Sequence, residues 1–293
     1  MMPRPPFTDT HVHFHDFSYP TLRWDWLLAE AEPDPDLGDY GAIKSHRYLP
    51  DDFLAETRFQ NVERVVHVQA AIGSRDPVEE TAWLQAHADR TGVPHGVIAH
   101  ADLAAPDVER TLERHAAFRI FRGIRDLRYD DYLTDEQWLR GFGALERFEA
   151  VVCDDPLVEH MPALARLASQ HPGLTVCIDH AGFPRRRDDT YFEQWRSGMA
   201  KLAACESTVV KISGLGMCDH RWTVESLRPW VLTCVDLWGP RRSFFGTNWP
   251  VDRLFSSYGD VVDAYAELLS GSSESERRDL FTGNARRIFR LDE

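Results

Sequence analysis

From residue 50 onward, the chain alternates between short apolar runs and longer segments in which apolar residues recur every three or four positions. The short runs are typical of β-strands buried on both faces, and the longer segments are typical of amphipathic helices. Together with a run near the start, this pattern predicts eight strands, at 7–14, 62–70, 95–103, 120–125, 150–153, 174–180, 208–212 and 242–246.

Amphipathic helices are expected between these strands. One begins at Asp76-Pro77, because an N-cap residue followed by proline is a frequent helix start. Another begins at Thr134-Asp-Glu-Gln137, which has the spacing of a capping box. The apolar periodicity predicts helices at 51–60, 76–90, 106–117, 134–148, 157–168, 189–204, 227–238, 259–270 and 275–289.

Eight strand–helix units without a linker or a break in composition indicate one domain over residues 1–293. Such a series predicts a (β/α)8 TIM barrel of the α/β class, which typically takes about 250 residues. A doubly wound open sheet is the alternative, but no Gly-x-Gly-x-x-Gly follows the first strand. The barrel is therefore the expected fold.

A segment at about 14–49 precedes this alternation and shows little periodicity. So long a connection in a compact domain is usually a lid or a binding loop. Trp24 and Trp26 within it either line a pocket or pin the segment to the body of the domain. We take Trp24 as a candidate to bind the substrate.

Composition narrows the class of partner. The net charge of −14 argues against nucleic acid or an anionic membrane. No apolar run reaches the length of a membrane helix, and residues 1–6 lack the apolar core of a signal peptide. Five scattered cysteines predict reduced thiols and a cytoplasmic protein. A polar or anionic small molecule is the expected partner, and assembly into a homo-oligomer stays open.

Two histidines, His11 and His13, lie in the first predicted strand. Side chains two apart in a strand point to the same face, so the two imidazoles lie side by side. Neutral imidazoles that converge on one point can bind a divalent metal or polarise a carbonyl. His180 ends the strand at 174–180 and brings a third imidazole to the same rim, because active sites of such barrels lie at the carboxyl ends of the strands.

Further polar residues lie at the carboxyl ends of other predicted strands. Arg125 is the candidate to bind a carboxylate or an oxyanion, since its guanidinium matches the geometry of such groups. Lys211 either binds the substrate or forms an internal ion pair. Asp154 is a candidate to contact the substrate, and Asp179 is expected to face the helix layer.

Three motifs carry a resemblance to a known family: Asp9-Thr-His-Val-His13, Asp179-His-Ala-Gly182 and Phe245-Gly-Thr-Asn-Trp-Pro250. In this order they resemble the amidohydrolase superfamily, in its lactonase-type, amidohydrolase-related branch of barrel hydrolases. The likeness runs the whole length of the chain, and Phe281–Phe289 resembles the closing helix of those proteins. The resemblance implies that His11, His13 and His180 bind a divalent metal, Zn²⁺ above all, or polarise the scissile carbonyl in metal-independent members.

Position 248 departs from that branch. The resemblance implies an Asp there, which takes a proton from the attacking water and also ligates the metal, but this chain has Asn248. An amide is uncharged and does not accept a proton at neutral pH. Three accounts follow: a natural variant with another base, namely Asp154, Asp252 or His180; a substitution engineered to trap substrate; or a reaction without activated water. We favour the first, and the departure leaves open that no metal is bound.

The predicted function is hydrolysis of a small carbonyl compound, above all a lactone that bears carboxylate or hydroxyl groups. In this hypothesis His11 and His13 polarise the carbonyl, Arg125 holds an anionic group of the substrate, and Asn248 replaces the usual acid among the catalytic residues. One alternative is a non-oxidative decarboxylase or another lyase, since related barrels use the same His-x-His pair and that reaction needs no hydrolytic base. A catalytically silent binding protein is the other.

Overall fold

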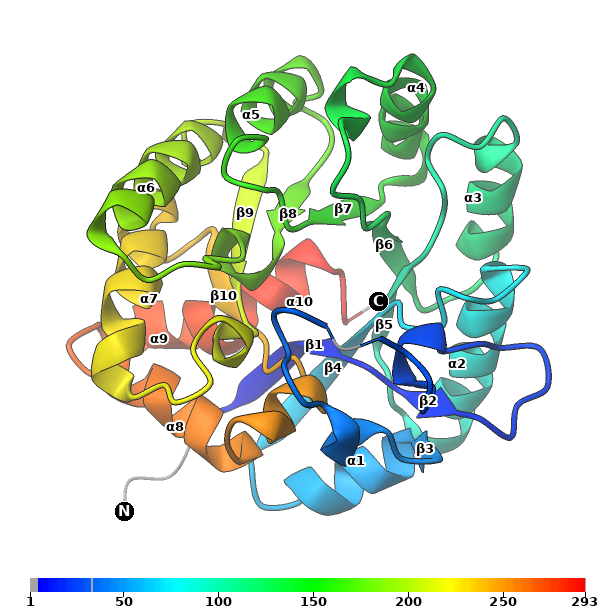
Figure 1. Cartoon of the computed structure of the whole chain (residues 1–293), viewed down its shortest axis with the longest axis horizontal. Coiled ribbons are helices and arrows are strands. Elements are labelled where there is room, and N and C mark those ends of the chain that lie inside the picture. Colours follow the sequence, from blue (N-terminus) through cyan, green and yellow to red (C-terminus); the bar gives the residue numbers. More distant parts are fainter. Residues whose placement is uncertain (1–4, 33, 293) are drawn as a thin grey trace.

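Eight parallel strands form a barrel in the computed structural model, which describes residues 5–32 and 34–292 (Figure 1). Strands adjacent in the sheet follow one another along the sequence, and each pair is parallel. A parallel bridge between Val12 and Trp249 joins the first strand to the residues after the last. This closure confirms the predicted (β/α)8 barrel and excludes the open sheet. The strands are β1 (Phe7–Val12), β4 (Val62–Val68), β5 (Gly96–Ala99), β6 (Phe121–Arg125), β7 (Val151–Asp154), β8 (Val176–Ile178), β9 (Thr208–Ile212) and β10 (Ser243–Phe245).

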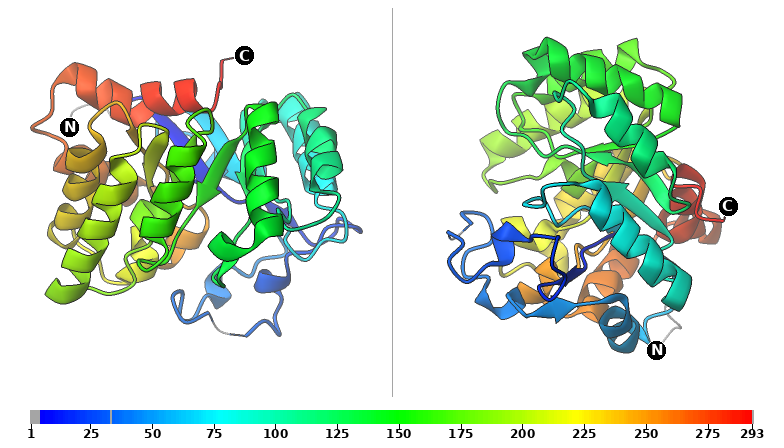
Figure 2. Two further views of the ribbon diagram at one scale, coloured as in Figure 1. Left: turned by 90° about the horizontal axis from the view of Figure 1, so that it is seen from above. Right: turned by 90° about the vertical axis from the view of Figure 1, so that its right-hand side faces the viewer.

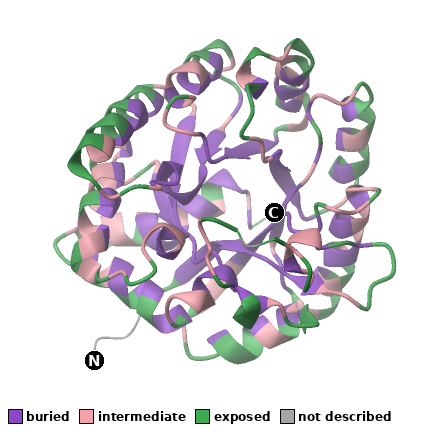
Figure 3. Cartoon of the chain, viewed as in Figure 1, coloured by how far each residue is buried: buried purple, intermediate pink, exposed green. Residues whose placement is uncertain are grey.

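Helices surround the barrel, with their buried faces toward the strands and their exposed faces outward (Figure 3). Apolar residues at helical spacing fill the layer between helices and strands, as the periodicity predicts. The helices are α1 (Pro50–Thr57), α2 (Val78–Thr91), α3 (Val108–Ala116), α4 (Glu136–Ala144), α5 (Met161–Gln170), α6 (Asp189–Ala203), α7 (Val224–Trp238), α8 (Tyr258–Leu268), α9 (Glu274–Arg278) and α10 (Asn284–Ile288).

The start of α4 differs from the predicted capping box. Asp135 is the N-cap, and its carboxylate accepts hydrogen bonds from the backbone N–H groups of Gln137 and Trp138, at 2.8 and 3.3 Å. Thr134 instead ends a short 3₁₀ turn that begins at Tyr132. Both residue types cap helices well, and the spacing alone does not decide between neighbours.

The helix predicted at 275–289 is divided in the structure. A π-helical turn, Asp279–Gly283, separates α9 from α10. The wider turn places the ring of Phe281 against Phe245, with ring centroids 5.1 Å apart. Packing against the last strand therefore overrides the uninterrupted helical period of the sequence.

The inside of the barrel is apolar toward the end at which the strands begin. Phe244 there packs against Phe289, which follows α10, with ring centroids 5.6 Å apart. Helix α10 closes this end, and the segment between β1 and α1 lies at the opposite end (Figure 2, left). The carboxyl ends of the strands are therefore the end available for a site.

The segment predicted as a long loop at about 14–49 is closed by a small two-stranded antiparallel sheet of β2 (His15–Asp16) and β3 (Arg47–Tyr48). Trp24 is buried within it, and its ring lies 5.6 Å from that of Trp83 on α2. Of the two roles considered for this tryptophan, the structure shows the structural one: Trp24 pins the segment to the barrel.

The structure also shows the state of the cysteines and the apolarity of the helices. All five cysteines are unbridged, and Cys153, Cys177 and Cys234 are buried. Among the described helices, none combines the length and apolarity needed to cross a bilayer. Residues 1–4, which carry part of the signal-peptide prediction, lie outside the described residues.

Candidate active site

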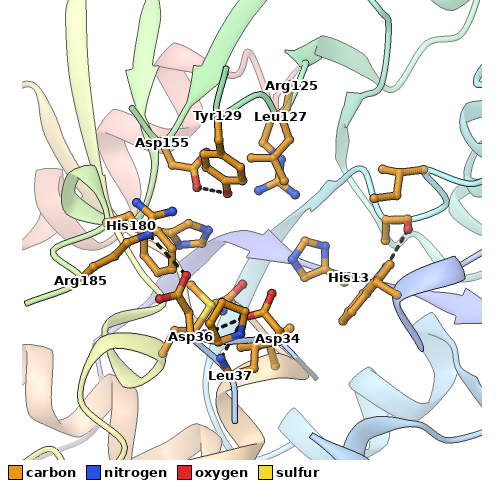
Figure 4. Close-up of a pocket in the computed structure, with 18 of the residues that line it drawn as sticks. His13, Asp34, Asp36, Leu37, Arg125, Leu127, Tyr129, Asp155, His180 and Arg185 are labelled. Atoms are coloured by element: carbon orange, nitrogen blue, oxygen red, sulfur yellow. Dashed lines mark hydrogen bonds and ion pairs between the residues drawn. The ribbon is translucent and has the colours of Figure 1, made fainter. Parts of the chain in front are cut away.

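A cavity of about 570 Å³ opens at the carboxyl ends of the strands. His13, Arg125 and His180 are arranged around it, with Asp36 and Leu37 of the long segment on the other side (Figure 4). Strands that are far apart in the sequence therefore deliver the predicted site residues to one place, as a closed barrel requires.

Hydrogen bonds fix the orientation of His13 and of His180. His13 Nδ1 lies 2.9 Å from the backbone oxygen of Val68. A carbonyl only accepts, so Nδ1 carries the proton and Nε2 keeps its lone pair. His180 Nδ1 lies 2.9 Å from the hydroxyl of Ser213, which leaves its Nε2 free of that bond.

All three imidazoles are held in the neutral form. Burial lowers the pKa of His11 and of His13 well below the ordinary value, and it lowers the pKa of His180 to about 3. Nearby cations, including Arg125, act in the same direction because they repel a second positive charge. Neutral imidazoles keep lone pairs for a metal or a proton.

Asp179 is the largest correction to the sequence prediction. It does not face the helix layer: it is fully buried at the centre of the site, and Lys211 Nζ lies 2.9 Å from its Oδ1. Arg125 Nη1 and His11 Nδ1 lie 3.8 and 3.7 Å from its Oδ2. Burial raises the pKa of Asp179, but Lys211, His180 and Arg125 together bring it below the ordinary value. Asp179 is therefore an ionised carboxylate among cations.

The residues around Asp179 suit a divalent metal ion. His11, Asp179 and His180 each offer one ligand atom, and these atoms lie within 4.8 Å of one another. His11 Nδ1 and Asp179 Oδ2 are buried, and neither has a hydrogen-bond partner among the described residues. Two imidazoles and one carboxylate are a donor set that Zn²⁺ and similar ions accept. The described group contains Asp179 in place of the predicted His13, whose Nδ1 is turned toward Val68.

Arg125 lies where the sequence placed it. Its Nη1 is 3.4 Å from His11 Nε2, and its Nη2 donates to the backbone oxygen of Gln69 at 3.2 Å. The side chain lines the cavity, so a guanidinium is presented to any molecule bound there. Gln69, which also lines the cavity, thus orients Arg125 through its main chain.

Trp24, Asp154 and Lys211 are placed differently from the other predicted substrate contacts, because each side chain is engaged away from the cavity. Lys211 is fully buried in its ion pair with Asp179, and Asp154 accepts a hydrogen bond from the hydroxyl of Tyr132 at 2.7 Å. In the long segment, Trp26 lines the cavity, whereas Trp24 is buried against Trp83 of α2. Lys211 therefore takes the second of its two predicted roles, the internal ion pair.

Asp155 lines the cavity and was missed by sequence reasoning, which named its neighbour Asp154. Its Oδ2 accepts from the hydroxyl of Tyr129 at 3.1 Å, and its buried Oδ1 has no partner among the residues described. Burial raises the pKa of Asp155 to about 6, although Arg125 and Arg185 act against this shift. A carboxylate that titrates near neutrality beside a cavity is a candidate general base.

Asp9 was also missed, although it begins the first motif. Its carboxylate accepts from the backbone N–H and the hydroxyl of Thr247, at 2.9 and 2.6 Å, and from the hydroxyl of Tyr258 at 2.9 Å. It also accepts from the backbone N–H of His11, at 3.2 Å. Asp9 thus joins the histidine strand to the turn that follows β10 and carries Asn248.

The wall of the cavity is formed in part by the long segment. Asp36 reaches Arg185 of the β8–α6 connection, with Oδ2 3.4 Å from Nε (Figure 4). The guanidinium of Arg185 also lies 3.9 Å from the centre of the Phe183 ring. This contact holds the long segment over the site, in keeping with the predicted role of a binding loop.

Known proteins resemble this chain in sequence and in structure. Its sequence matches a family model described as amidohydrolase over residues 8–291. A Sinorhizobium fredii protein described as uncharacterized protein y4mH is 35% identical, and the match covers 95% of this chain and 97% of that protein. An L-fucono-1,5-lactonase of Burkholderia multivorans is 28% identical, with 97% and 96% covered. The crystal structure of an amidohydrolase from Burkholderia multivorans with bound zinc superposes with a TM-score of 0.82 and 27% identity, covering 98% of this chain and 100% of that one.

Proposed function

The chain belongs to the amidohydrolase family, and from that premise we propose that this hydrolase opens the ring of a lactone bearing carboxylate or hydroxyl groups. The observation that carries the proposal is the convergence of His13, His180, Arg125 and Asp155 at one cavity, with His11 buried behind Arg125. The 28% identity to an L-fucono-1,5-lactonase over nearly the whole chain supports the substrate class.

Arg125 is the group best placed to stabilise the developing oxyanion. Its guanidinium donates hydrogen bonds, whereas the free Nε2 of His13 carries a lone pair and only accepts. As water attacks the lactone carbonyl, negative charge grows on the carbonyl oxygen, and a fixed cation in a buried site stabilises that charge. His13 Nε2 then serves as an acceptor for a substrate hydroxyl or for the attacking water.

Asp155 is the proposed base. It takes a proton from water as the oxygen attacks the carbonyl carbon, and it returns the proton to the ring oxygen when the C–O bond of the lactone breaks. Water is consumed and a hydroxy acid is formed. Of the three bases expected from sequence, only His180 lines the cavity, and burial holds its pKa near 3, which makes it a weaker base than Asp155.

A divalent ion, Zn²⁺ above all, held by His11, Asp179 and His180 would supply Lewis-acid polarisation of the carbonyl. Lys211 and Arg125 lie beside the same carboxylate and repel a cation, so we expect modest metal affinity. Thermal unfolding with and without added Zn²⁺ measures this independently of activity, because a ligand that binds the folded state raises the melting temperature. His11→Ala should remove the shift, and exposed His46→Ala should keep it.

A panel of sugar-acid lactones, with acid release followed by a pH indicator, tests the reaction. We expect ring opening of at least one lactone, lost in Arg125→Gln and kept in His46→Ala. The alternative of decarboxylation is supported by the uncharged Asn248, since loss of carbon dioxide needs no base for water. Carbon dioxide release from hydroxylated aromatic acids, with no acid release from lactones, would overturn the hydrolytic proposal.

A further inference from the structure

The amide of Asn248 is held in one orientation by two acceptors. Its Nδ2 donates to Asp252 Oδ2 at 2.8 Å and lies 3.3 Å from the sulfur of Met217. A carboxylate and a thioether only accept, so the amide nitrogen must face them. The amide oxygen, Oδ1, therefore points the other way.

The other face of Asn248 belongs to the cavity. Asn248 is among the residues that line it, and within the described part of the chain no donor is bonded to its Oδ1. The residue has a φ of 60° at the start of the turn after β10, and this turn is closed by a hydrogen bond from Asp252 N to Asn248 O at 3.2 Å. A hydrogen-bond acceptor is thus presented to the site from a fixed backbone position.

Asp252 stands behind Asn248 and is itself fixed. Its side chain is 2% exposed, and its Oδ1 accepts from the backbone N–H of Gly216 at 3.2 Å. Any Cβ at Gly216 would come within 2.7 Å of that oxygen, so the approach is close. Asp252 does not reach a molecule in the cavity except through Asn248.

We propose that Asp252 is a positioning residue that locks the amide of Asn248 with its oxygen toward the cavity, where it orients the attacking water. The proposal rests on the hydrolytic function proposed above. Asn248 accepts a hydrogen bond from the water without taking its proton, and Asp155 takes that proton.

The contact between Asn248 and Asp252 limits which residues the two positions can carry together. A carboxylate at 248 would meet the carboxylate of Asp252 across a hydrogen-bond distance, and two such groups share one proton. Exchanging the two residues, as in N248D/D252N, restores one amide and one carboxylate in contact. The two positions are therefore expected to be strongly coupled.

Three variants test the coupling: D252N, N248D and N248D/D252N, with exposed Asp236→Asn on α7 as the matched control. For D252N we expect kcat on the lactone to fall about 10- to 100-fold at unchanged KM, because the water is misplaced while the substrate still binds. N248D should be no better than D252N, and the exchanged pair should regain activity to within about tenfold of the starting protein. Asp236→Asn should match the starting protein.

Two further readouts separate this proposal from the proposed function. The side-chain NH₂ signal of Asn248 in ¹⁵N NMR spectra should move in D252N and not in Asp236→Asn, and the melting temperature lost in N248D should return in N248D/D252N. Both readouts can be measured even if the protein hydrolyses no lactone; a lack of lactone hydrolysis would contradict only the proposed function. Additive effects of the two substitutions on melting temperature, or an unmoved Asn248 signal, would overturn the positioning role.

Discussion

The ends of β8 and β10 each carry a buried aspartate, and the two differ in charge. Asp179 after β8 meets Lys211 and Arg125, and these cations bring its pKa below the ordinary value against the effect of burial. Asp252 after β10 meets an amide and a backbone N–H, and burial raises its pKa to about 7. Equal burial thus gives opposite shifts, because the neighbours decide which form is stable. One end of the site holds a permanent charge, and the other holds a carboxyl–amide pair whose acid titrates near neutral pH.

The largest effect is expected when the cation is removed from the β8 end. Lys211→Met leaves Asp179 buried beside a single, more distant cation, and the free energy of unfolding should fall by about 3–5 kcal/mol. Chemical denaturation measures this change, with exposed Lys201→Met on α6 as the control. K211M/D179N should recover most of the loss. A loss below about 1 kcal/mol in K211M would contradict the charged state assigned to Asp179.

Removing the oxyanion donor should affect rate more than stability. In Arg125→Gln we expect kcat/KM on the lactone to fall about 10²- to 10³-fold, the usual cost of losing one such donor. Steady-state kinetics and the melting temperature measured together separate the two effects, with exposed Arg140→Gln as the control. If the melting temperature falls as far as the loss of activity requires, Arg125 is a structural residue, and the mechanism needs another oxyanion donor.

The third test concerns the pH dependence of the reaction. A base works in its ionised form, and the pKa of Asp155 is about 6, so kcat/KM should rise with pH through about 6 and then level off. Asp155→Asn should lower kcat about 10²- to 10⁴-fold and remove this limb. Asp236→Asn should leave the profile intact. A limb that survives in Asp155→Asn would assign the base elsewhere.

The smallest effect is a stability change at Asp154. Burial raises the pKa of Asp154 to about 8, so the folded state binds a proton that the unfolded state has lost. The stabilisation this gives is complete below the ordinary value of 3.8 and disappears as pH rises through about 8. Asn does not ionise and still accepts the Tyr132 hydrogen bond. Asp154→Asn should melt close to the starting protein at pH 4 and a few degrees higher at pH 9, with the difference growing in between; the reverse order would refute the shift.

Sequence reasoning found the barrel and the elements that build the rim, because hydrophobic periodicity reports directly which face of an element is buried. It also predicted that the side chains of four residues meet at the same rim of the barrel, namely His11, His13, His180 and Arg125. Their roles as ligands or catalytic groups stay predictions. Periodicity describes only the regular part of each strand, not the irregular residues at its end.

The errors lie where strands stop. Strand β8 ends at Ile178, and His180 and Ala181 adopt left-handed conformations, with φ of 51° and 54°. Asp179 lies on the same inner face as Cys177 two residues before it, and the left-handed backbone at His180 brings the next side chain to the site as well, so both neighbours face inward. At the end of β7 the prediction was wrong by one residue: it named Asp154, but Asp155 lines the cavity. Partners such as Lys211 for Asp179 come from other strands, and local pattern carries no information about them.

The hydrogen bonds of Asp9 bear on when the site can form. Asp9 and Thr247, which they join, are 238 positions apart in the sequence. During synthesis from the N-terminus, the histidine strand emerges long before the turn that follows β10. The loop between Asp9 and Thr247 is long, so we expect the contact between them to form late in folding. A nascent chain that has not yet reached Thr247 thus carries the histidine strand without the turn to which Asp9 anchors it.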